Sequence, residues 1–258
     1  MPTKVPLFSA KNLSLTFPTG DQIVQAVQTC NVTIPEQAVT IIFGASGSGK
    51  SSLLNVISGL QKPTSGSLFY RNTNIYDQSH DELAYYRAHE LGIVYQTNYW
   101  VKSLNVLDNV AMPLYFQGFS QTDAHRRAQE ALSAVDMANF EKKPPVWLSG
   151  GEQQRVAVAR VFVAAPPVII ADEPTGSLDS KNGDSIIKLL KNLRDGQNKT
   201  VVLVTHNMEY LHIANHLLEV QDGSVTQIEE NQIPKTIDKM LGDTQKRITE
   251  LMKGSVGA

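Results

Sequence analysis

The sequence predicts an α/β fold with a mainly parallel core sheet. Short apolar segments typical of buried strands alternate with segments of helical periodicity, a pattern that favours a parallel sheet covered on both faces. The strand candidates are Val39–Phe43, Ile93–Tyr95, Val168–Ala171 and Val201–Thr205. Glycine or polar residues follow each of them, so we expect the functional site at the carboxyl edge of this sheet.

A small antiparallel β-subdomain is expected before the core sheet. Phe8–Phe17 and Val24–Ile34 have the composition of strands. Pro18–Asp21 separates them from each other, and Pro35-Glu36 separates the second from the core strand that follows. Both separators have the chemistry of turns.

The middle of the chain changes to helical periodicity. Ser120 can cap a helix over Gln121–Met137, in which three apolar residues recur at helical spacing: Ala128, Leu132 and Val135. We therefore expect a helical subdomain, roughly residues 97–164, inserted into an α/β domain of residues 1–230. A C-terminal extension, residues 231–258, is expected to be helical because Lys235–Lys253 places its apolar residues roughly on one face. That face packs on its own domain or contacts a partner, and the sequence leaves both open.

Composition excludes several classes of protein. A length of 258 residues fits one large domain, and a formal net charge of −2 gives no broad basic field for nucleic acid, which is not an expected partner. Cys30 is the only cysteine, so no intrachain disulfide can form, and a buried thiol is expected. No apolar run reaches the roughly 18–20 residues that span a bilayer. We expect a cytoplasmic protein whose membrane role, if any, comes through a partner.

A glycine-rich loop joins the first core strand to a helix expected over Ser51–Ser58, with Gly59 as its stop. Glycines allow the backbone N–H groups of such a loop, and the helix N-terminus, to approach phosphate groups. Lys50 adds a positive charge, and Ser51 adds a hydroxyl that can bind Mg²⁺. The expected phosphate-binding residues are Gly44, Ala45, Ser46, Gly47, Ser48, Gly49, Lys50, Ser51 and Ser52.

Acidic and polar residues follow the other core strands. Asp172 is expected to hold Mg²⁺ through water, and Glu173 to act as the general base that polarises the water attacking the γ-phosphate. His206 closes the next strand and can reach the same edge to sense that phosphate. Gln96 follows Ile93–Tyr95 and can contact both Mg²⁺ and the attacking water while it heads the helical insert.

A second anion site is expected at the start of a helix over Gln153–Ala164. Ser149, Gly150 and Gly151 lie at its N-terminus, which favours negative charge. One chain needs only one phosphate cradle, so the second indicates that each copy serves the nucleotide of another copy. The sequence thus predicts a head-to-tail homodimer that encloses two ATP molecules.

From about Phe8 to Val225 the chain resembles the nucleotide-binding subunits of ABC transporters, which are P-loop NTPases. The three motifs Gly44–Ser51, Leu148–Arg155 and Ala171–Asp179 are similar to those of the branch that contains lipoprotein-releasing, macrolide-export and FtsE-type cell-division ATPases.

The resemblance implies further roles. Phe17 would stack on adenine, and Glu152 and Asp179 would join the nucleotide site, with Ser177–Asp179 signalling across the dimer. Gln96–Leu104 would line the groove for the coupling helix of an integral membrane permease. Within that segment, Tyr99 and Trp100 either face the permease or are buried in the insert.

The chain departs from the common family pattern at three positions. Phe17 replaces a tyrosine, which keeps an aromatic face for adenine but loses a hydroxyl. Asn207 replaces the aspartate that commonly follows the switch histidine, and Ser52 replaces a threonine. Because neither of these two positions carries proton transfer, we expect hydrolysis to be retained.

The leading functional hypothesis is an ATP-hydrolysing subunit on the cytoplasmic face of the inner (plasma) membrane of a bacterium. It would dimerise on ATP and drive a permease that exports or extracts lipoproteins, peptides or hydrophobic compounds, or that signals mechanically to cell-wall enzymes. The alternatives are a soluble ABC ATPase acting on ribosomes or DNA, and an ATP-dependent switch with negligible turnover. A metal site at His212 and His216, four residues apart on an expected helix, is a minor possibility.

Overall fold

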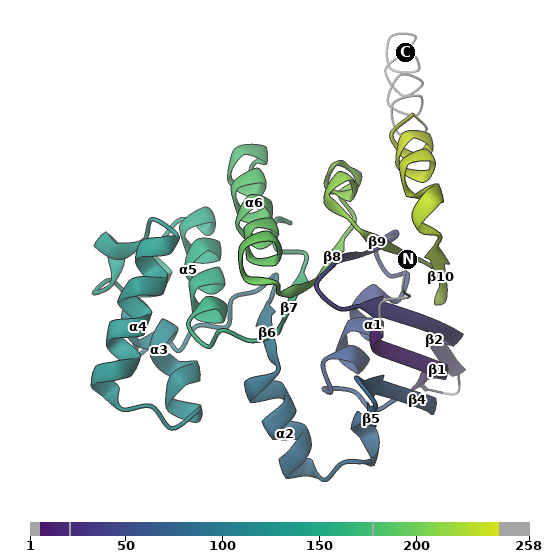
Figure 1. Ribbon diagram of the computed structural model, residues 1–258, viewed down its shortest axis with the longest axis horizontal. Helices are drawn as coiled ribbons and strands as arrows, with labels where there is room; N and C mark the ends of the chain where they lie inside the picture. The colour runs from purple at the N-terminus through teal and green to yellow at the C-terminus, as the bar shows by residue number, and fades with distance from the viewer. Residues whose placement is uncertain (1–5, 21, 177, 243–258) are drawn as a thin grey trace.

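A six-stranded sheet forms the centre of the computed structural model, which describes residues 6–20, 22–176 and 178–242 (Figure 1). Its strand order is β10-β9-β3-β8-β7-β6, and all neighbours are parallel except β10, which is antiparallel to β9. The strands are β3 (Val39–Phe43), β6 (Leu91–Val94), β7 (Val168–Asp172), β8 (Thr200–Thr205), β9 (His216–Gln221) and β10 (Ser224–Ile228). The predicted parallel α/β core is confirmed.

An antiparallel sheet of order β2-β1-β4-β5 lies beside the central sheet. Its strands are β1 (Pro6–Thr19), β2 (Gln22–Pro35), β4 (Ser65–Tyr70) and β5 (Thr73–Asn74). The long hairpin of β1 and β2 was expected from the turn residues between them. β4 and β5 were not, because their alternation of polar and apolar residues is short.

Six labelled helices between residues 50 and 197, and a further helical stretch over residues 233–242, complete the described part of the architecture. Three of them, α3, α4 and α5, form a lobe at one side of the central sheet (Figure 1). Helix α6 lies next to this lobe and packs against the central sheet. The helices are α1 (Lys50–Ile57), α2 (His80–His89), α3 (Val106–Phe116), α4 (Gln121–Ala134), α5 (Gly150–Phe162) and α6 (Ser180–Gln197). Short 3₁₀ segments lie at Ile75–Asp77, Ala138–Phe140, Pro145–Trp147, Met208–Ile213 and Glu230–Gln232.

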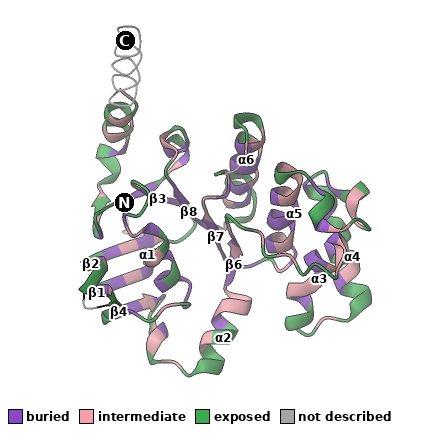
Figure 2. Ribbon diagram, turned by 180° about the vertical axis from the view of Figure 1, so that it is seen from behind, coloured by how far each residue is buried: buried purple, intermediate pink, exposed green. Residues whose placement is uncertain are grey.

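The core strands separate two hydrophobic clusters. In β3, Ile41 and Phe43 point into the cluster shared with α3–α6, whereas Ile42 points into the cluster shared with α1 and the antiparallel sheet. All three side chains are fully buried, and Figure 2 shows the same burial along the neighbouring strands. This two-sided burial explains why the core strands are apolar without alternation.

Most predicted elements are present with shifted ends. Ser120 caps α4 as expected, and Ala128, Leu132 and Val135 are buried, but the helix ends at Ala134 instead of Met137. The last turn of the predicted helix is lost because Asp136 has a left-handed backbone with φ of 61°. The expected helix carrying His212 and His216 is wrong, because His216 begins β9.

The C-terminal extension is helical over residues 233–242. Ile233 is buried, and Ile237 and Met240 pack against the hydrophobic cluster of the helical side. These contacts favour packing on the chain's own domain for this part, while residues 243–258, the rest of the predicted extension, lie outside the described residues. Among the residues described, no helix combines the length and the apolar character needed to cross a membrane.

Two glycines with similar backbone angles provide a test of the antiparallel sheet. Gly66 (φ 78°) and Gly118 (φ 84°) both adopt a left-handed backbone, but a Cβ on Gly66 would collide with the Asn12 and Lys11 carbonyl oxygens, whereas one on Gly118 meets open space. We expect Gly118→Ala to cost about 1 kcal/mol of unfolding free energy and Gly66→Ala about 1–3 kcal/mol more. Urea unfolding followed by circular dichroism measures both. Equal costs would contradict the packing of β4 on β1.

Candidate nucleotide-binding and catalytic site

The glycine-rich loop between β3 and α1 is enclosed by backbone from two other strands. Gly44 and Gly49 have positive φ angles of 151° and 109°. A Cβ on Gly44 would collide with the Val220 carbonyl oxygen in β9, and one on Gly49 with the Ala26 carbonyl oxygen in β2. These glycines are therefore required both by their backbone conformation and by the closeness of their neighbours.

Lys50, the first residue of α1, is buried within this loop. Its Nζ atom donates hydrogen bonds to the carbonyl oxygens of Gly44 at 2.9 Å and of Ala45 at 2.7 Å. The Ser48 hydroxyl is also buried and is without a hydrogen-bond partner among the described residues. A cationic donor and an unsatisfied hydroxyl facing an N-terminal helix turn fit the binding of a phosphate chain.

Two acidic residues and a histidine meet at the carboxyl edge of the sheet. Asp172 ends β7, and the Glu173 Oε1 atom lies 2.9 Å from Nδ1 of His206, the residue after β8. Glu173 has a φ of 47°, an uncommon value for a residue with a side chain, which turns its carboxylate toward the histidine. The structure thus brings all three residues to the same edge of the sheet, where the sequence predicted them.

The Asp172 carboxylate lies beside the phosphate loop. Burial raises its pKa, the neighbouring Glu173 charge raises it further, and the Ser51 hydroxyl and Lys50 charge lower it. Its Oδ1 atom is buried and has no hydrogen-bond partner within the described part of the chain. A buried, unsatisfied carboxylate oxygen close to a serine hydroxyl is a donor set that fits Mg²⁺.

Gln96 reaches the same edge from the loop after β6. Its amide nitrogen lies 3.2 Å from the point where a Cβ on Gly176 would be, and the Glu173 carbonyl borders the same point. Gln96 is therefore next to the turn that follows the acidic pair. The strand itself ends at Val94, so one residue, Tyr95, separates it from the glutamine.

A cavity of about 500 Å³ opens between the phosphate loop and the β1–β2 hairpin. Phe17, Lys50, Ser51 and Ser52 line it, so the residue that we expect to stack on adenine lies beside the glycine-rich loop.

The other side of this cavity was not predicted from the sequence. Asp222 and Gly223, in the turn between β9 and β10, line it as well, and the Gly223 N–H donates a 2.8 Å hydrogen bond to the Ser48 carbonyl. An Asp-Gly pair is a recognisable turn signal, but nothing in the sequence indicates that this turn contacts the loop.

The second predicted anion site lies elsewhere. Ser149 is the N-cap of α5, and its hydroxyl accepts a hydrogen bond from the Glu152 N–H while Glu152 Oε2 accepts one from the Ser149 N–H at 2.8 Å. These bonds hold the pKa of Glu152 below its usual value. Neither residue lines the cavity of Phe17, and nor do Gly150 and Gly151.

Asp179 caps α6 and brings that helix close to the start of α5. Its carboxylate accepts a 2.9 Å hydrogen bond from the Asn182 N–H. A Cβ on Gly151 would lie 3.0 Å from Asn182, and one on Gly150 3.8 Å from Leu178. The N-termini of α5 and α6 thus form one exposed surface. Ser177, the first residue of the segment expected to signal across the dimer, lies outside the described residues.

Side chains of α5 fasten the loop that carries Gln96. Trp100 donates from Nε1 to Gln153 Oε1 at 2.8 Å, and Arg160 donates to the Asn98 carbonyl at 2.7 Å. The guanidinium of Arg160 lies 4.6 Å from the Trp100 ring centre, and burial lowers the pKa of Arg160. Trp100 is therefore packed in the insert, whereas Tyr99 is 69% exposed. Burial in the insert therefore holds for Trp100, while Tyr99 lies at the surface.

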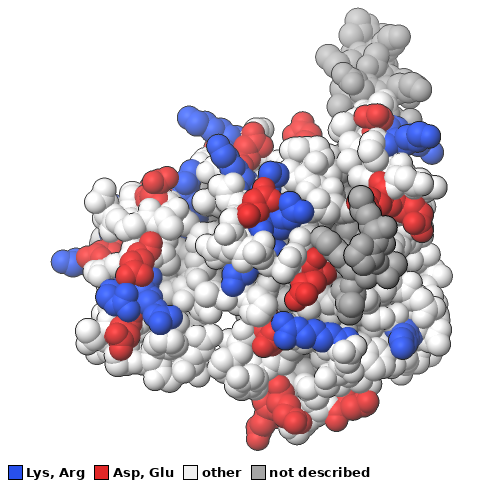
Figure 3. Space-filling view, viewed as in Figure 1, with Lys and Arg blue, Asp and Glu red and all other residues white. Residues whose placement is uncertain are grey.

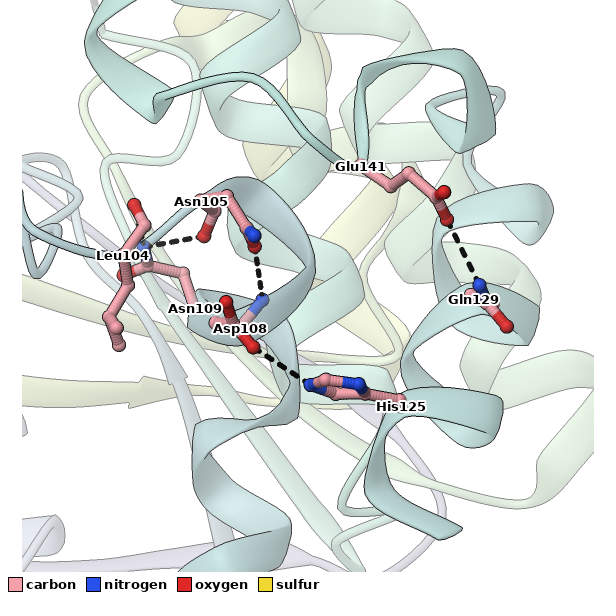
Figure 4. A network of polar contacts seen from close by, with 7 residues as sticks. All are labelled: Leu104, Asn105, Asp108, Asn109, His125, Gln129 and Glu141. Carbon is pink, nitrogen blue, oxygen red and sulfur yellow. Dashed lines mark hydrogen bonds and ion pairs between the residues drawn. The ribbon is translucent and has the colours of Figure 1, made fainter. Parts of the chain in front are cut away.

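The end of the same loop is fixed to the helical lobe (Figure 4). Asn109 donates to the Leu104 carbonyl at 3.1 Å, and Asn105 caps α3 by accepting from the Asp108 N–H at 2.8 Å. Asp108 in turn forms a 2.8 Å ion pair or hydrogen bond with His125 of α4. The segment from Gln96 to Leu104 is thus held by side chains at both ends.

Comparison with known proteins identifies the family. A family model described as ABC transporter matches residues 27–176. MJ0796, an uncharacterized ABC transporter ATP-binding protein of Methanocaldococcus jannaschii, is 40% identical over 223 residues, which are 85% of this chain and 95% of that protein. The lipoprotein-releasing system ATP-binding protein LolD of Desulfotalea psychrophila is 35% identical over 85% of this chain and 98% of its own length.

Two further similarities concern a longer protein and a solved structure. The macrolide export ATP-binding/permease protein MacB of Agrobacterium fabrum is 35% identical over 88% of this chain, which covers 35% of MacB. The dimeric post-hydrolysis structure of the MJ0796 cassette with ADP and Pi has a TM-score of 0.81 and 38% identity, covering 86% of this chain and 98% of that one. The chain belongs to the ABC transporter family, and it is an ATP-binding ATPase.

The cavity makes Phe17 a direct test of nucleotide binding. Phe17→Ala should raise the Kd for ATP about three- to tenfold, because a stacked aromatic pair contributes roughly 0.5–1.5 kcal/mol. Isothermal titration calorimetry in the presence of Mg²⁺ measures it. Phe17→Tyr is the matched control and should bind as the wild type does. An unchanged Kd for Phe17→Ala would remove this residue from the site.

Proposed function

We propose that this chain is the ATP-hydrolysing subunit of a bacterial ABC complex on the cytoplasmic face of the inner membrane. The observation that carries the proposal is the convergence of Asp172, Glu173 and His206 beside the phosphate loop. The relatives named for lipoprotein release and macrolide export support a role in extracting or exporting such hydrophobic cargo. Export of peptides and mechanical signalling to cell-wall enzymes are further tasks open to such a complex.

The residues at the sheet edge divide the chemistry between them. Loop N–H groups from Gly44 to Ser52 and the Lys50 ammonium bind the phosphates of ATP, and Glu173 accepts the proton of the attacking water. His206 orients that carboxylate through the bond they share. When bound, Mg²⁺ supplies positive charge that neutralises the phosphates, and Ser51, Gln96 and Asp172 would hold it.

A head-to-tail homodimer explains the second anion site. Ser149, Gly150, Gly151 and Glu152 do not reach the cavity of their own chain. They would serve the ATP bound by a second copy, with Asp179 and its loop between the two sites. The dimeric MJ0796 structures support dimerisation of a cassette of this kind.

The permease would contact the loop from Gln96 to Leu104. Tyr99 and Val101 are exposed there, while the ends of the loop are fastened to α5 and α3. A permease that displaces the exposed part of the loop would therefore also displace Gln96 and the helical lobe. A soluble role on ribosomes or DNA has no comparable support, since positive and negative side chains are interspersed on the face seen in Figure 3.

The proposed general base is tested by Glu173→Gln. Steady-state phosphate release should fall about 10²–10⁴-fold, because the amide cannot accept the proton, while ATP binding is retained. Light scattering at saturating ATP and Mg²⁺ should then show a long-lived dimer. A Glu173→Gln protein that stays monomeric would contradict the ATP-enclosing dimer, and one that hydrolyses at the wild-type rate would contradict the base.

Ser149→Arg is a second test of the dimer. A bulky cation at the exposed N-terminus of α5 should block association in the Glu173→Gln protein. One ATP per monomer should still bind in calorimetry, since Ser149 is absent from the cavity lining. Loss of ATP binding together with dimerisation would show that this residue acts within its own chain.

The permease contact is tested by capture from detergent-solubilised membranes of the source organism. The Glu173→Gln protein with ATP and Mg²⁺ should retain an integral membrane protein with a large extracytoplasmic domain. Adding Tyr99→Asp should reduce the retained amount at least about tenfold, because a buried unpaired charge is costly. Leu241→Asp, at an exposed position of the C-terminal helix, is the control and should have no effect. Equal loss with both variants would place the contact elsewhere.

A further inference from the structure

Two large apolar side chains are exposed immediately before the N-terminus of α5. Trp147 is 76% exposed and Val146 is 55% exposed, although Pro145 and Leu148 on either side are buried. The 3₁₀ turn Pro145–Trp147 is held by backbone hydrogen bonds from the Trp147 and Leu148 N–H groups, so it is a fixed platform. A rigid, exposed tryptophan beside a valine is typical of a contact surface.

A second exposed apolar patch lies at the nucleotide cavity. Ile23 is 76% exposed and Val24 is 49% exposed, and in the β1–β2 register they pair with Pro18 and Phe17. Val24 and Phe17 also line the cavity. This patch is therefore continuous with the surface on which the base of a nucleotide would stack.

One chain cannot bring the two patches together. The turn of Trp147 leads directly into α5 in the helical lobe, whereas β1 and β2 lie on the opposite side of the molecule in both ribbon views (Figures 1 and 2). A second copy can, because a head-to-tail dimer places the N-terminus of α5 over the phosphate loop of its partner. The two-fold symmetry of such a dimer then produces the contact twice.

We propose that Trp147 and Val146 of one copy pack against Ile23 and Val24 of the other. The contact rests on the head-to-tail dimer of the proposed function and extends its interface beyond the phosphate-binding residues. Trp147 covers the open side of the cavity next to Phe17 and so shields the base from water. Closure of the dimer would thus be driven in part by burial of apolar surface and not by the nucleotide phosphates alone.

Site-directed cross-linking tests the contact between copies. One batch of the Glu173→Gln protein carries Trp147→Cys and another carries Ile23→Cys, and the two are mixed before a short bis-maleimide reagent is added. Each batch has one introduced thiol, and Cys30 is buried. A cross-linked dimer should form with ATP and Mg²⁺ and not without nucleotide. Phe116→Cys, at an exposed position of α3, replaces Trp147→Cys in the control mixture and should give no cross-link.

The energetic weight of the contact is tested by two substitutions at one position. In the Glu173→Gln protein, Trp147→Ala should raise the Kd of the ATP-bound dimer about 10- to 100-fold, because the lost apolar burial occurs twice. Trp147→Phe retains most of that burial and should change it only a few-fold. Because the side chain is exposed, thermal unfolding of the monomer should be unchanged for both.

The outcomes separate the contact from the dimer on which it rests. An ATP-dependent dimer that gives no specific cross-link, or that forms equally well with Trp147→Ala, would overturn the contact and leave the dimer intact. A Glu173→Gln protein that forms no dimer with ATP would overturn both. A cross-link in the mixture together with weaker dimerisation by Trp147→Ala establishes the contact.

Discussion

The structure depends on the close approach of three backbone segments around the phosphate loop. Gly44 lies against β9, Gly49 lies against β2, and the Gly223 N–H bonds the Ser48 carbonyl. These contacts join the central sheet to the antiparallel sheet at the loop itself. The wall that carries Phe17 is consequently fixed relative to the residues that we propose to bind phosphate, so the two sides of the cavity form one rigid unit.

The carboxyl edge of the sheet connects this receptor to the rest of the molecule. Asp172 and His206 end or follow neighbouring parallel strands, and the left-handed backbone at Glu173 directs its carboxylate between them. Gln96 joins the same edge from the third strand. Because parallel strands deliver their ends to one side, residues far apart in the chain become neighbours without long loops.

Much of this could be predicted from the sequence, for identifiable reasons. The buried strands are apolar throughout, and the polar residues that end them mark the edge, so Asp172, Glu173 and His206 follow from pattern alone. The Asp222-Gly223 wall of the cavity and the Arg160–Trp100 contact could not be predicted, because each depends on tertiary packing between distant segments. The predicted end of α4 was wrong because the sequence does not reveal the left-handed backbone at Asp136. The predicted place of His216 was wrong because short apolar runs do not distinguish a helix from a strand.

The fastening of the Gln96 loop to α5 has a mechanical consequence. Gln153 accepts a hydrogen bond from Trp100 in the first turn of α5, and Arg160 donates one to Asn98 in its last turn. The loop is therefore attached at two points along one helix. A displacement of the loop would therefore rotate or shift the whole of α5, and its N-cap residue Ser149 would move with it. In the head-to-tail dimer that we propose, the nucleotide state of one site would thus reach the surface that faces the other copy as a rotation of α5, without any unfolding.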